Sequence, residues 1–254
     1  METVRLFDFD FHSAHNCDKI LAYLSDWTLQ EGQLPVLITP NVDQIVKFNR
    51  EENKGLKARL QNAALVLPDG QPLIWSSKLK KGSALKSRLT GSDLFPILWS
   101  QFQNEGKRVF FILPRKSLGE EFEKQYDNCA FYSPPFFSLT NGEEYQAVLE
   151  ECILAIRRFS PEHVMIGLGF PKQERLALDL IDEFHKEKIF YHLLGASFEF
   201  YHGKKKRAPK WMQKAGLEFL HRMIMEPGRM IKRYLIEDLA FIPLLIKELR
   251  SPKI

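Results

Sequence analysis

The sequence predicts an α/β fold built on a doubly wound, mainly parallel sheet. Short apolar runs are bounded by Pro, Gly or polar residues, a pattern typical of strands that are buried on both faces. Longer stretches with apolar residues at helical spacing lie between these runs. Strands that alternate with helices in this way form βαβ units, and therefore parallel sheets.

The expected elements follow one another as far as Gly195. We expect strands at 34–39, 64–67, 109–113, 130–132, 163–167 and 189–194. Helices are expected at 17–30, after 40–41, at 73–79, from Ser92 or Asp93 to 103, up to 126, at 143–159 and from 171 to about 186. Beyond Gly195 the chain becomes helical, basic and aromatic, and prolines interrupt it. We therefore expect a catalytic core at 1–195 and a separate helical appendage at 196–254.

The composition favours a folded protein of the reducing cytosol. The chain has 254 residues, enough for a sizeable core, and its three cysteines are unclustered. The first residues include a Glu and no apolar run, so we expect no signal peptide. No stretch approaches the roughly 18 uncharged apolar residues of a membrane-spanning helix. These features argue against a disulfide framework and against a Cys-ligated zinc site.

Basic residues gather near the C-terminus. Between residues 200 and 233 there are ten Lys and Arg side chains and two Glu, a net charge of +8, whereas the whole chain carries +4. Such a block indicates an anionic partner. The apolar residues among the basic ones have helical spacing, which suits a helix in an anionic membrane interface or one packed in a core or an oligomer contact.

Asp69 follows one of the apolar runs, with Gly70 and Gln71 directly after it. Open α/β sheets bind ligands at the carboxyl ends of their strands, and a glycine lets a substrate approach the backbone. Asp69 is therefore a candidate catalytic residue. The alternative is that Asp69 caps the helix that starts near Gln71.

A second candidate lies between the strand at 163–167 and the next helix. Gly167 and Gly169 permit close backbone approach, and the N-terminus of the helix attracts phosphate. Lys172, Gln173 and Glu174 follow, and the last two offer hydrogen bonds to a ribose, sugar or base. The alternative is a plain turn, because the dinucleotide-binding fingerprint is incomplete.

A third candidate runs from Arg88 to Asp93. It brings a cation, the hydroxyls of Thr90 and Ser92 and a carboxylate close together. Arginine binds phosphate oxygens bidentately, which suits a sugar diphosphate. The alternative is a helix capped by Ser92 or Asp93 beside a solvated Arg88.

No pattern indicates a metal or another cofactor. The seven His residues lack metal-ligand spacing. Asp8 and Asp10 are two apart, but their alternation with Phe7, Phe9 and Phe11 predicts a solvated strand edge. Neither a Walker loop nor a G-x-S-x-G elbow is present, which weakens NTPase and hydrolase hypotheses.

Taken in order, these segments resemble the WecG/TagA/CpsF family of bacterial glycosyltransferases. The motifs that carry the likeness are T-P-N at 39–41, L-P-D-G at 67–70, R-L-T-G-S-D-L at 88–94, G-L-G-F-P-K-Q-E at 167–174, K-R-A-P at 206–209, G-L-E-F-L-H-R at 216–222, E-P-G-R at 226–229 and R-Y at 233–234. They cover about residues 30 to 242, and their common order is more specific than any single motif.

The resemblance implies an inverting, metal-independent enzyme with a Rossmann-like core. Such enzymes move a sugar from a UDP-sugar to a saccharide on undecaprenyl diphosphate, for exopolysaccharide or cell-envelope glycan. The implied location is the cytoplasmic face of the bacterial inner membrane, to which a basic appendage attaches the enzyme peripherally.

The resemblance also implies roles for individual residues. Asp69 would be the general base, with Thr39 beside it in the catalytic set. Together with the candidates above, the substrate-binding set is Asn41, Gly70, Gln71, Arg88, Ser92, Asp93, Gly167, Gly169, Lys172, Gln173, Glu174, Glu199 and Arg207. The appendage arginines Arg222, Arg229 and Arg233 would neutralise the acceptor diphosphate at the anionic membrane surface.

Two departures from the family pattern concern the donor sugar. Glu199 stands where an Asp is usual, and Pro114, Arg115 and Lys116 replace a glycine pair. N-acetylmannosamine and its uronic acid are the commoner donors of the family. We expect UDP-glucose here, with UDP-ManNAc or UDP-ManNAcA as alternatives. The sequence sets neither the acceptor sugar nor the oligomeric state, so a homo-oligomer stays open.

Two other classes of protein share parts of the pattern. A nucleic-acid-binding protein would place the basic block on phosphates, but no RNA-binding module with exposed aromatics is recognisable. A nucleotide-dependent oxidoreductase would need a complete G-x-G-x-x-G and an acidic residue for the ribose. We therefore expect no nucleic-acid partner.

Overall fold

The computed structural model describes residues 1–80, 82, 84–214, 216–233 and 237–251. Contacts between Cα atoms divide the chain into two compact units. Unit 1 comprises residues 1–27, 39–90 and 206–254, and unit 2 comprises residues 28–38 and 91–205.

A six-stranded sheet confirms the predicted α/β class. Its strand order is β4-β3-β8-β7-β5-β6, and the pairs from β3 through β6 in that order are parallel. The strands are β3 (Leu34–Ile38), β4 (Ala63–Val66), β5 (Val109–Ile112), β6 (Cys129–Tyr132), β7 (His163–Ile166) and β8 (Phe190–Leu193). Every strand expected in this part of the chain is present, with small shifts at the ends.

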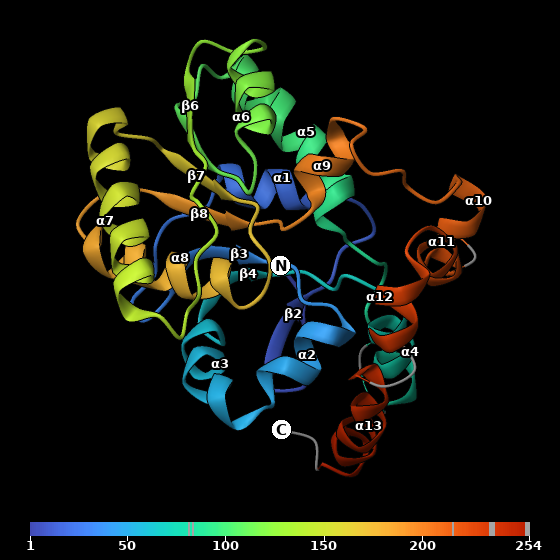
Figure 1. The fold of residues 1–254 in the computed structure, drawn as a ribbon. Helices are drawn as coiled ribbons and strands as arrows, with labels where there is room; N and C mark the ends of the chain where they lie inside the picture. The colour runs from blue at the N-terminus through green and yellow to red at the C-terminus, as the bar shows by residue number, and fades with distance from the viewer. Residues whose placement is uncertain (81, 83, 215, 234–236, 252–254) are drawn as a thin grey trace. The chain divides into compact units, whose positions relative to one another are not determined.

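Helices cover both faces of the strands in unit 2. The connection from β5 to β6 and the connection from β6 to β7 run in opposite directions across the sheet, so right-handed crossovers place their helices on opposite faces. Figure 1 shows α7 and α8 on one side of these strands and α5, α6 and α9 on the other. The five helices are α5 (Gly91–Asn104), α6 (Lys116–Glu123), α7 (Gly142–Phe159), α8 (Lys172–Glu183) and α9 (Ser197–Tyr201).

This winding gives unit 2 a point at which the direction of the crossovers reverses. The strands β5 and β7 are neighbours. The chain continues from β5 into α6 on one face of the sheet and from β7 into α8 on the other face. The carboxyl ends of such a strand pair border the crevice in which doubly wound sheets bind ligands. Gly167 directly follows β7 there, and a Cβ atom on it would lie 2.6 Å from the ring of Phe198. A side chain at Gly167 would therefore displace the ring of Phe198 on α9.

An aromatic cluster forms the core between the sheet and α5, α6 and α9. The rings of Phe111 on β5 and Phe122 on α6 stack with centroids 4.3 Å apart, and Phe95 on α5 meets Phe198 on α9 edge-on at 4.7 Å. All four side chains are buried. Such pairs add a geometric preference to the burial of apolar area, so this cluster fixes the helices against the strands.

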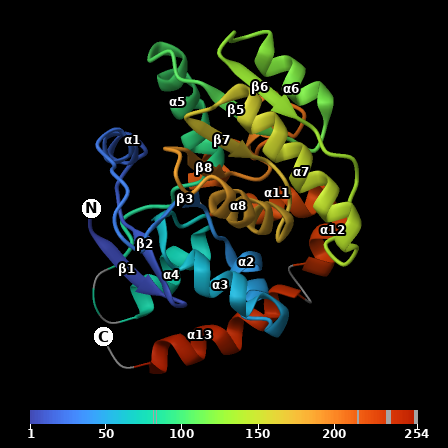
Figure 2. The ribbon, with the colours of Figure 1, turned by 90° about the vertical axis from the view of Figure 1, so that its left-hand side faces the viewer.

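Unit 1 combines an antiparallel hairpin with short helices. The hairpin strands are β1 (Thr3–Leu6) and β2 (Phe9–His12). The helices are α1 (Asp18–Ser25), α2 (Val42–Phe48), η1 (Glu51–Asn53), α3 (Lys54–Leu60), α4 (Gln71–Leu79), α10 (Lys210–Lys214), α11 (Glu218–Met225), α12 (Pro227–Lys232), η3 (Asp238–Ala240) and α13 (Phe241–Arg250). In Figure 2, α13 lies beside α2, which it contacts.

The hairpin confirms that the two N-terminal carboxylates are exposed. Asp8 lies in the turn rather than on a strand, with Phe7, and both residues have positive φ. The Asp8 carboxylate pairs with Lys57 at 2.6 Å, and Asp10 pairs with Arg5 at 2.9 Å. Each carboxylate therefore has its own cation, and the two do not share a strand face.

The C-terminal helices pack within unit 1. Phe241 contacts Phe7 with ring centroids 5.1 Å apart, and Lys80 pairs with Glu248 at 2.5 Å. Residues 206–254 thus belong to the same compact unit as the hairpin and α2–α4. A membrane-associating appendage at 196–254 stays a prediction. None of the described helices combines the length and the apolar character needed to cross a membrane.

Candidate active site

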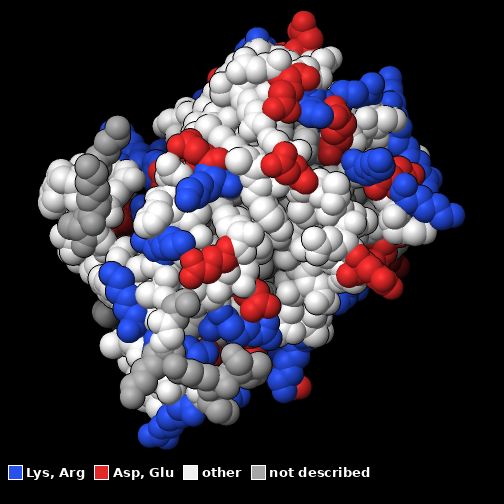
Figure 3. All heavy atoms as spheres, turned by 180° about the vertical axis from the view of Figure 1, so that it is seen from behind, with Lys and Arg blue, Asp and Glu red and all other residues white. Residues whose placement is uncertain are grey.

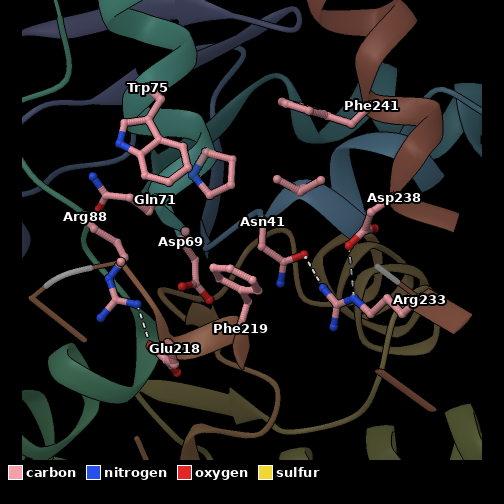
Figure 4. Close-up of a pocket in the computed structure, with 14 residues that line it drawn as sticks. Asn41, Asp69, Gln71, Trp75, Arg88, Glu218, Phe219, Arg233, Asp238 and Phe241 are labelled. Atoms are coloured by element: carbon pink, nitrogen blue, oxygen red, sulfur yellow. Dashed lines mark hydrogen bonds and ion pairs between the residues drawn. The ribbon is translucent and has the colours of Figure 1, made fainter. Parts of the chain in front are cut away.

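A cavity of about 340 Å³ in unit 1 collects many of the predicted residues. Its volume falls within the range of small-molecule sites, roughly 300–1,000 Å³. Figure 4 shows ion pairs on opposite sides of the cavity, with Asp69 and Phe219 between them. The lining residues are Asn41, Val42, Asp69, Gly70, Gln71, Pro72, Trp75, Arg88, Gly216, Glu218, Phe219, Arg233, Asp238 and Phe241.

Asp69 lies just beyond the carboxyl end of β4, as predicted. Its backbone N–H donates to the carbonyl oxygen of Pro40 at 3.0 Å, and the N–H of Leu89 donates to Pro68 at 3.0 Å. These bonds fix the turn that carries the carboxylate. Gly70, with φ of +128°, occupies the N-cap position of α4, where a side chain would be strained. The alternative that Asp69 is the helix cap is therefore wrong.

Arg88 and Glu218 form an ion pair at one side of the cavity. Their charged atoms are 2.6 Å apart, and their side chains are 15% and 13% exposed. Residue 88 precedes α5 and residue 218 begins α11, so the pair joins segments 130 residues apart in sequence. The alternative of a solvated Arg88 is wrong: the guanidinium is held at the cavity wall.

Asn41 and Arg233 form the opposite side. The Asn41 side chain caps α2 by accepting from the N–H of Gln44, and it also accepts from Nη2 of Arg233 at 3.2 Å. Arg233 lies 3.6 Å from the carboxylate of Asp238 and 3.9 Å from that of Asp43. Burial raises the pKa of Asp238 to about 6, although Arg233 opposes that shift.

Aromatic and aliphatic side chains make up much of the remaining wall. Trp75 on α4 is half exposed beside Pro72, and Phe219 and Phe241 come from α11 and α13. Gly216, with φ of +75°, packs so closely that a Cβ atom on it would lie 3.0 Å from Cγ of Gln71. The sequence analysis did not select Trp75, Phe219 or Phe241. A helical stripe of apolar residues gives no signal that distinguishes a pocket wall from a core.

Unit 2 holds a second cluster, at the start of α8. Gln173 and Glu174 are buried, and the amide of Gln173 donates to Oε1 of Glu174 at 2.9 Å. Oε1 of Gln173 has no hydrogen-bond partner among the described residues. Lys172 donates to the carbonyl oxygen of Phe137 and lies over the ring of Phe136. The structure thus groups the predicted residues 172–174 with an aromatic loop that the sequence analysis missed.

The two departures from the family pattern meet in space. Arg115 lies 3.2 Å from Glu199, and Lys205 lies 2.5 Å from the other oxygen of the same carboxylate. Glu199 is buried, whereas Arg115 is largely exposed. Two cations therefore neutralise the Glu199 carboxylate, and one of them, Arg115, belongs to the segment in which the resemblance leads us to expect a glycine pair.

Other predicted residues lie elsewhere. Ser92 and Asp93 fall in the first turn of α5, which begins at Gly91, so neither caps that helix as expected. Thr39 directly follows β3 and is nearly buried. Arg207 donates to Gln213 at 3.1 Å, outside the cavity lining. The side chains of Arg222 and Arg229 lie outside the described part of the structure.

Acidic partners offset part of the basic block. Lys204 pairs with Glu121, Lys205 with Glu199, and Arg233 with Asp238. On the face drawn in Figure 3, acidic side chains likewise lie among the basic ones. The formal charge of residues 200–233 therefore overstates the positive field that a partner meets.

The family model described as "Glycosyl transferase WecG/TagA/CpsF family" matches residues 4–254. The chain belongs to this family. It is therefore a glycosyltransferase, as the ordered motifs predicted.

Two relatives specify what similar chains do. An N-acetylglucosaminyldiphosphoundecaprenol N-acetyl-beta-D-mannosaminyltransferase of Bacillus spizizenii (strain W23) is 27% identical over 235 residues, which cover 90% of this chain and 86% of the relative. A protein of the same name from Bacillus subtilis (strain 168) is 29% identical over 222 residues, 84% and 80% of the two chains. These names do not support the expected glucose donor and favour the alternative, N-acetylmannosamine.

Proposed function

We propose that this glycosyltransferase moves N-acetylmannosamine from UDP-ManNAc to N-acetylglucosamine on undecaprenyl diphosphate. The observation that carries the proposal is the placement of Asp69 in a cavity that also offers aromatic walls and two arginines. Its support comes from the two relatives, whose names specify this sugar and this acceptor.

In the proposed reaction, the Asp69 carboxylate takes the proton of an acceptor hydroxyl. The hydroxyl oxygen attacks the anomeric carbon from the face opposite UDP, and the bond between that carbon and the UDP oxygen breaks. One displacement inverts the anomeric configuration. A positioned general base contributes roughly 10²–10⁴-fold to such a step.

The leaving diphosphate needs positive charge. Arg88 is the candidate in the cavity, because its guanidinium is held at the wall by Glu218 and can bind phosphate oxygens bidentately. Arg207 is the second candidate. We propose that the reaction needs no metal, and the assay below includes a chelator for that reason.

Within unit 2, we propose a separate nucleotide-binding position at the carboxyl ends of β5 and β7. Gly169 is exposed with open space around it there, Gln173 offers an unpartnered amide oxygen, and the N-terminus of α8 favours phosphate. Phe136 is 91% exposed on the loop before α7 and offers a ring face for a base.

We propose that the enzyme attaches peripherally to the cytoplasmic face of an anionic membrane. The acceptor of the relatives is lipid-linked. Large apolar side chains are exposed on α11 and α13, among them Phe219, Ile224, Ile242 and Ile246, and basic residues accompany them. A helix with this composition suits a membrane interface.

The test is transfer to a synthetic lipid-diphosphate-linked N-acetylglucosamine. UDP-ManNAc, UDP-ManNAcA, UDP-GlcNAc and UDP-glucose are supplied separately, each with and without EDTA. The proposal predicts product from UDP-ManNAc in both conditions. Product from UDP-glucose alone would show that the donor is UDP-glucose, as the sequence analysis expected. Loss of product with EDTA would contradict the metal-independent mechanism.

A further inference from the structure

Asp238 has unmet hydrogen-bonding capacity in the cavity wall. It begins η3, and its side chain is only 10% exposed. Its Oδ2 lies 3.6 Å from Nε of Arg233, too far for a hydrogen bond, and its Oδ1 is buried without a partner among the described residues. Buried carboxylates are costly unless they accept hydrogen bonds. A ligand that brings a donor to this wall would relieve that cost.

Asn41 places a donor on the same wall. Its Oδ1 accepts from the N–H of Gln44 and from Nη2 of Arg233, both at 3.2 Å. This pattern fixes the amide orientation and leaves the NH₂ group of Asn41 for a ligand in the cavity. Figure 4 shows Arg233 between Asn41 and Asp238, so one arginine holds the donor and the acceptor in place.

An apolar surface completes this wall. Phe241 begins α13, three residues after Asp238, and Figure 4 shows it on the same side of the cavity. Val42, next to Asn41, also lines the cavity. The wall therefore combines one hydrogen-bond acceptor, one donor and an apolar patch.

We propose that Asp238, Asn41 and Phe241 form a subsite for the acetamido group of an N-acetylhexosamine. The acetamido N–H donates to the Asp238 carboxylate, its carbonyl oxygen accepts from the Asn41 amide, and its methyl group packs on Phe241. The inference rests on the proposed function, in which donor and acceptor sugars both carry this group. A hydroxyl in place of the acetamido group offers its donor and its acceptor on one atom instead of two, and it lacks the methyl group. Such a mismatch discriminates strongly between ligands.

Ionisation of Asp238 gives the subsite a pH dependence. Arg233 and Lys47 favour its charged form, Asp43 and Glu237 disfavour it, and burial places the pKa at about 6. The charged groups Asp69, Arg88 and Glu218 line the same cavity. Above about pH 6 the carboxylate accepts the acetamido N–H, and protonation below that pH weakens this acceptor. The preference for N-acetylated substrate should therefore decline as the pH falls through about 6.

The test compares substrates that differ only at this group. On the acceptor side, lipid-diphosphate-linked GlcNAc is compared with the glucose analogue, and on the donor side UDP-ManNAc with UDP-mannose. Three variants are compared. Asp238→Leu removes the hydrogen-bond acceptor at similar side-chain volume, Asp238→Asn keeps a carbonyl acceptor, and Glu237→Leu is the control outside the cavity lining.

We expect Asp238→Leu to reduce the preference for the N-acetylated member of one substrate pair about tenfold to hundredfold, through KM. Asp238→Asn should restore part of it. The pair that responds identifies which sugar occupies the subsite.

Binding separates this inference from the proposed function. GlcNAc 1-phosphate against glucose 1-phosphate, and UDP-ManNAc against UDP-mannose, are titrated into the full chain and followed by NMR, which needs no turnover. The wild type should bind the N-acetylated sugar more tightly, and Asp238→Leu should abolish the difference. An unchanged preference in both Asp238 variants would overturn the subsite, whatever the transfer assay shows. A wild type that prefers the N-acetylated sugar but transfers none would overturn only the proposed function.

Discussion

Asp69 illustrates what a single residue's sequence context can predict. An apolar run ending in Pro-Asp-Gly predicts a strand that delivers a carboxylate to the ligand-binding edge of a parallel sheet. The structure confirms that Asp69 lies just after β4 and gives the N-cap position of α4 to Gly70 instead of Asp69. Its position in the cavity supports the proposed role as general base.

Asp238 and Phe241 show the opposite case. Neither residue lies in a motif that predicts chemistry, and both reach the cavity from the C-terminal helices, far along the chain from Asp69. The Arg88–Glu218 pair likewise joins positions 130 residues apart. Contacts of this kind depend on how helices pack, which local periodicity does not encode. Sequence reasoning therefore identified some polar residues of the site, among them Asn41, Asp69 and Arg88, but neither Asp238 nor the apolar walls.

Most elements could be predicted, because apolar periodicity and turn residues agree with the tertiary structure. The start of α5 could not: Ser92 and Asp93 are good caps, but the helix already begins at Gly91. Gly91 is buried, and a Cβ atom on it would lie 2.7 Å from Oγ of Ser197. Thr90, the residue before Gly91, is also a favoured cap type, so the local sequence offers three adjacent starts and does not reveal the close packing of Gly91 against α9.

The exposed apolar residues of α11 can be tested as a membrane contact. Ile224 is 75% exposed, and burial of such a side chain in lipid is worth roughly 1.5–3 kcal/mol. We expect Ile224→Glu to weaken binding to anionic phospholipid vesicles about tenfold or more in a co-sedimentation assay. Leu154→Glu is the matched control, since Leu154 is 60% exposed on α7 in unit 2 and has no part in the basic sequence of residues 200–233. Equal binding by both variants would argue against α11 as a membrane contact.

Across the whole molecule, buried histidines make stability depend on pH. Desolvation lowers the pKa of His12 and of His163 to about 4 and that of His192 well below its usual range. The unfolded chain, with histidine pKa values near 6.5, binds more protons than the folded chain below that pH. These histidines therefore do not lower the free energy of unfolding above pH 6.5, and they lower it progressively as the pH falls from 6.5 towards 4.

This decline has an expected size and a test. Each buried histidine contributes up to about 1.4 kcal/mol per pH unit between 6.5 and 4. Nδ1 of His12 accepts a hydrogen bond from the N–H of Val66 at 3.2 Å, and a glutamine there retains an acceptor. We expect urea denaturation of His12→Gln at pH 7, 6 and 5 to show a shallower decline than the wild type. A parallel decline would contradict the burial of a neutral imidazole.

The most direct test of the account is turnover by Asp69→Asn with UDP-ManNAc and lipid-diphosphate-linked GlcNAc. Because the amide keeps the shape of the carboxylate but cannot take the hydroxyl proton, we expect kcat to fall roughly 10²–10⁴-fold. The melting temperature should stay close to that of the wild type, and Asp10→Asn, in the exposed hairpin, should retain full turnover. Near-normal turnover by folded Asp69→Asn would contradict the assignment of Asp69 as the base.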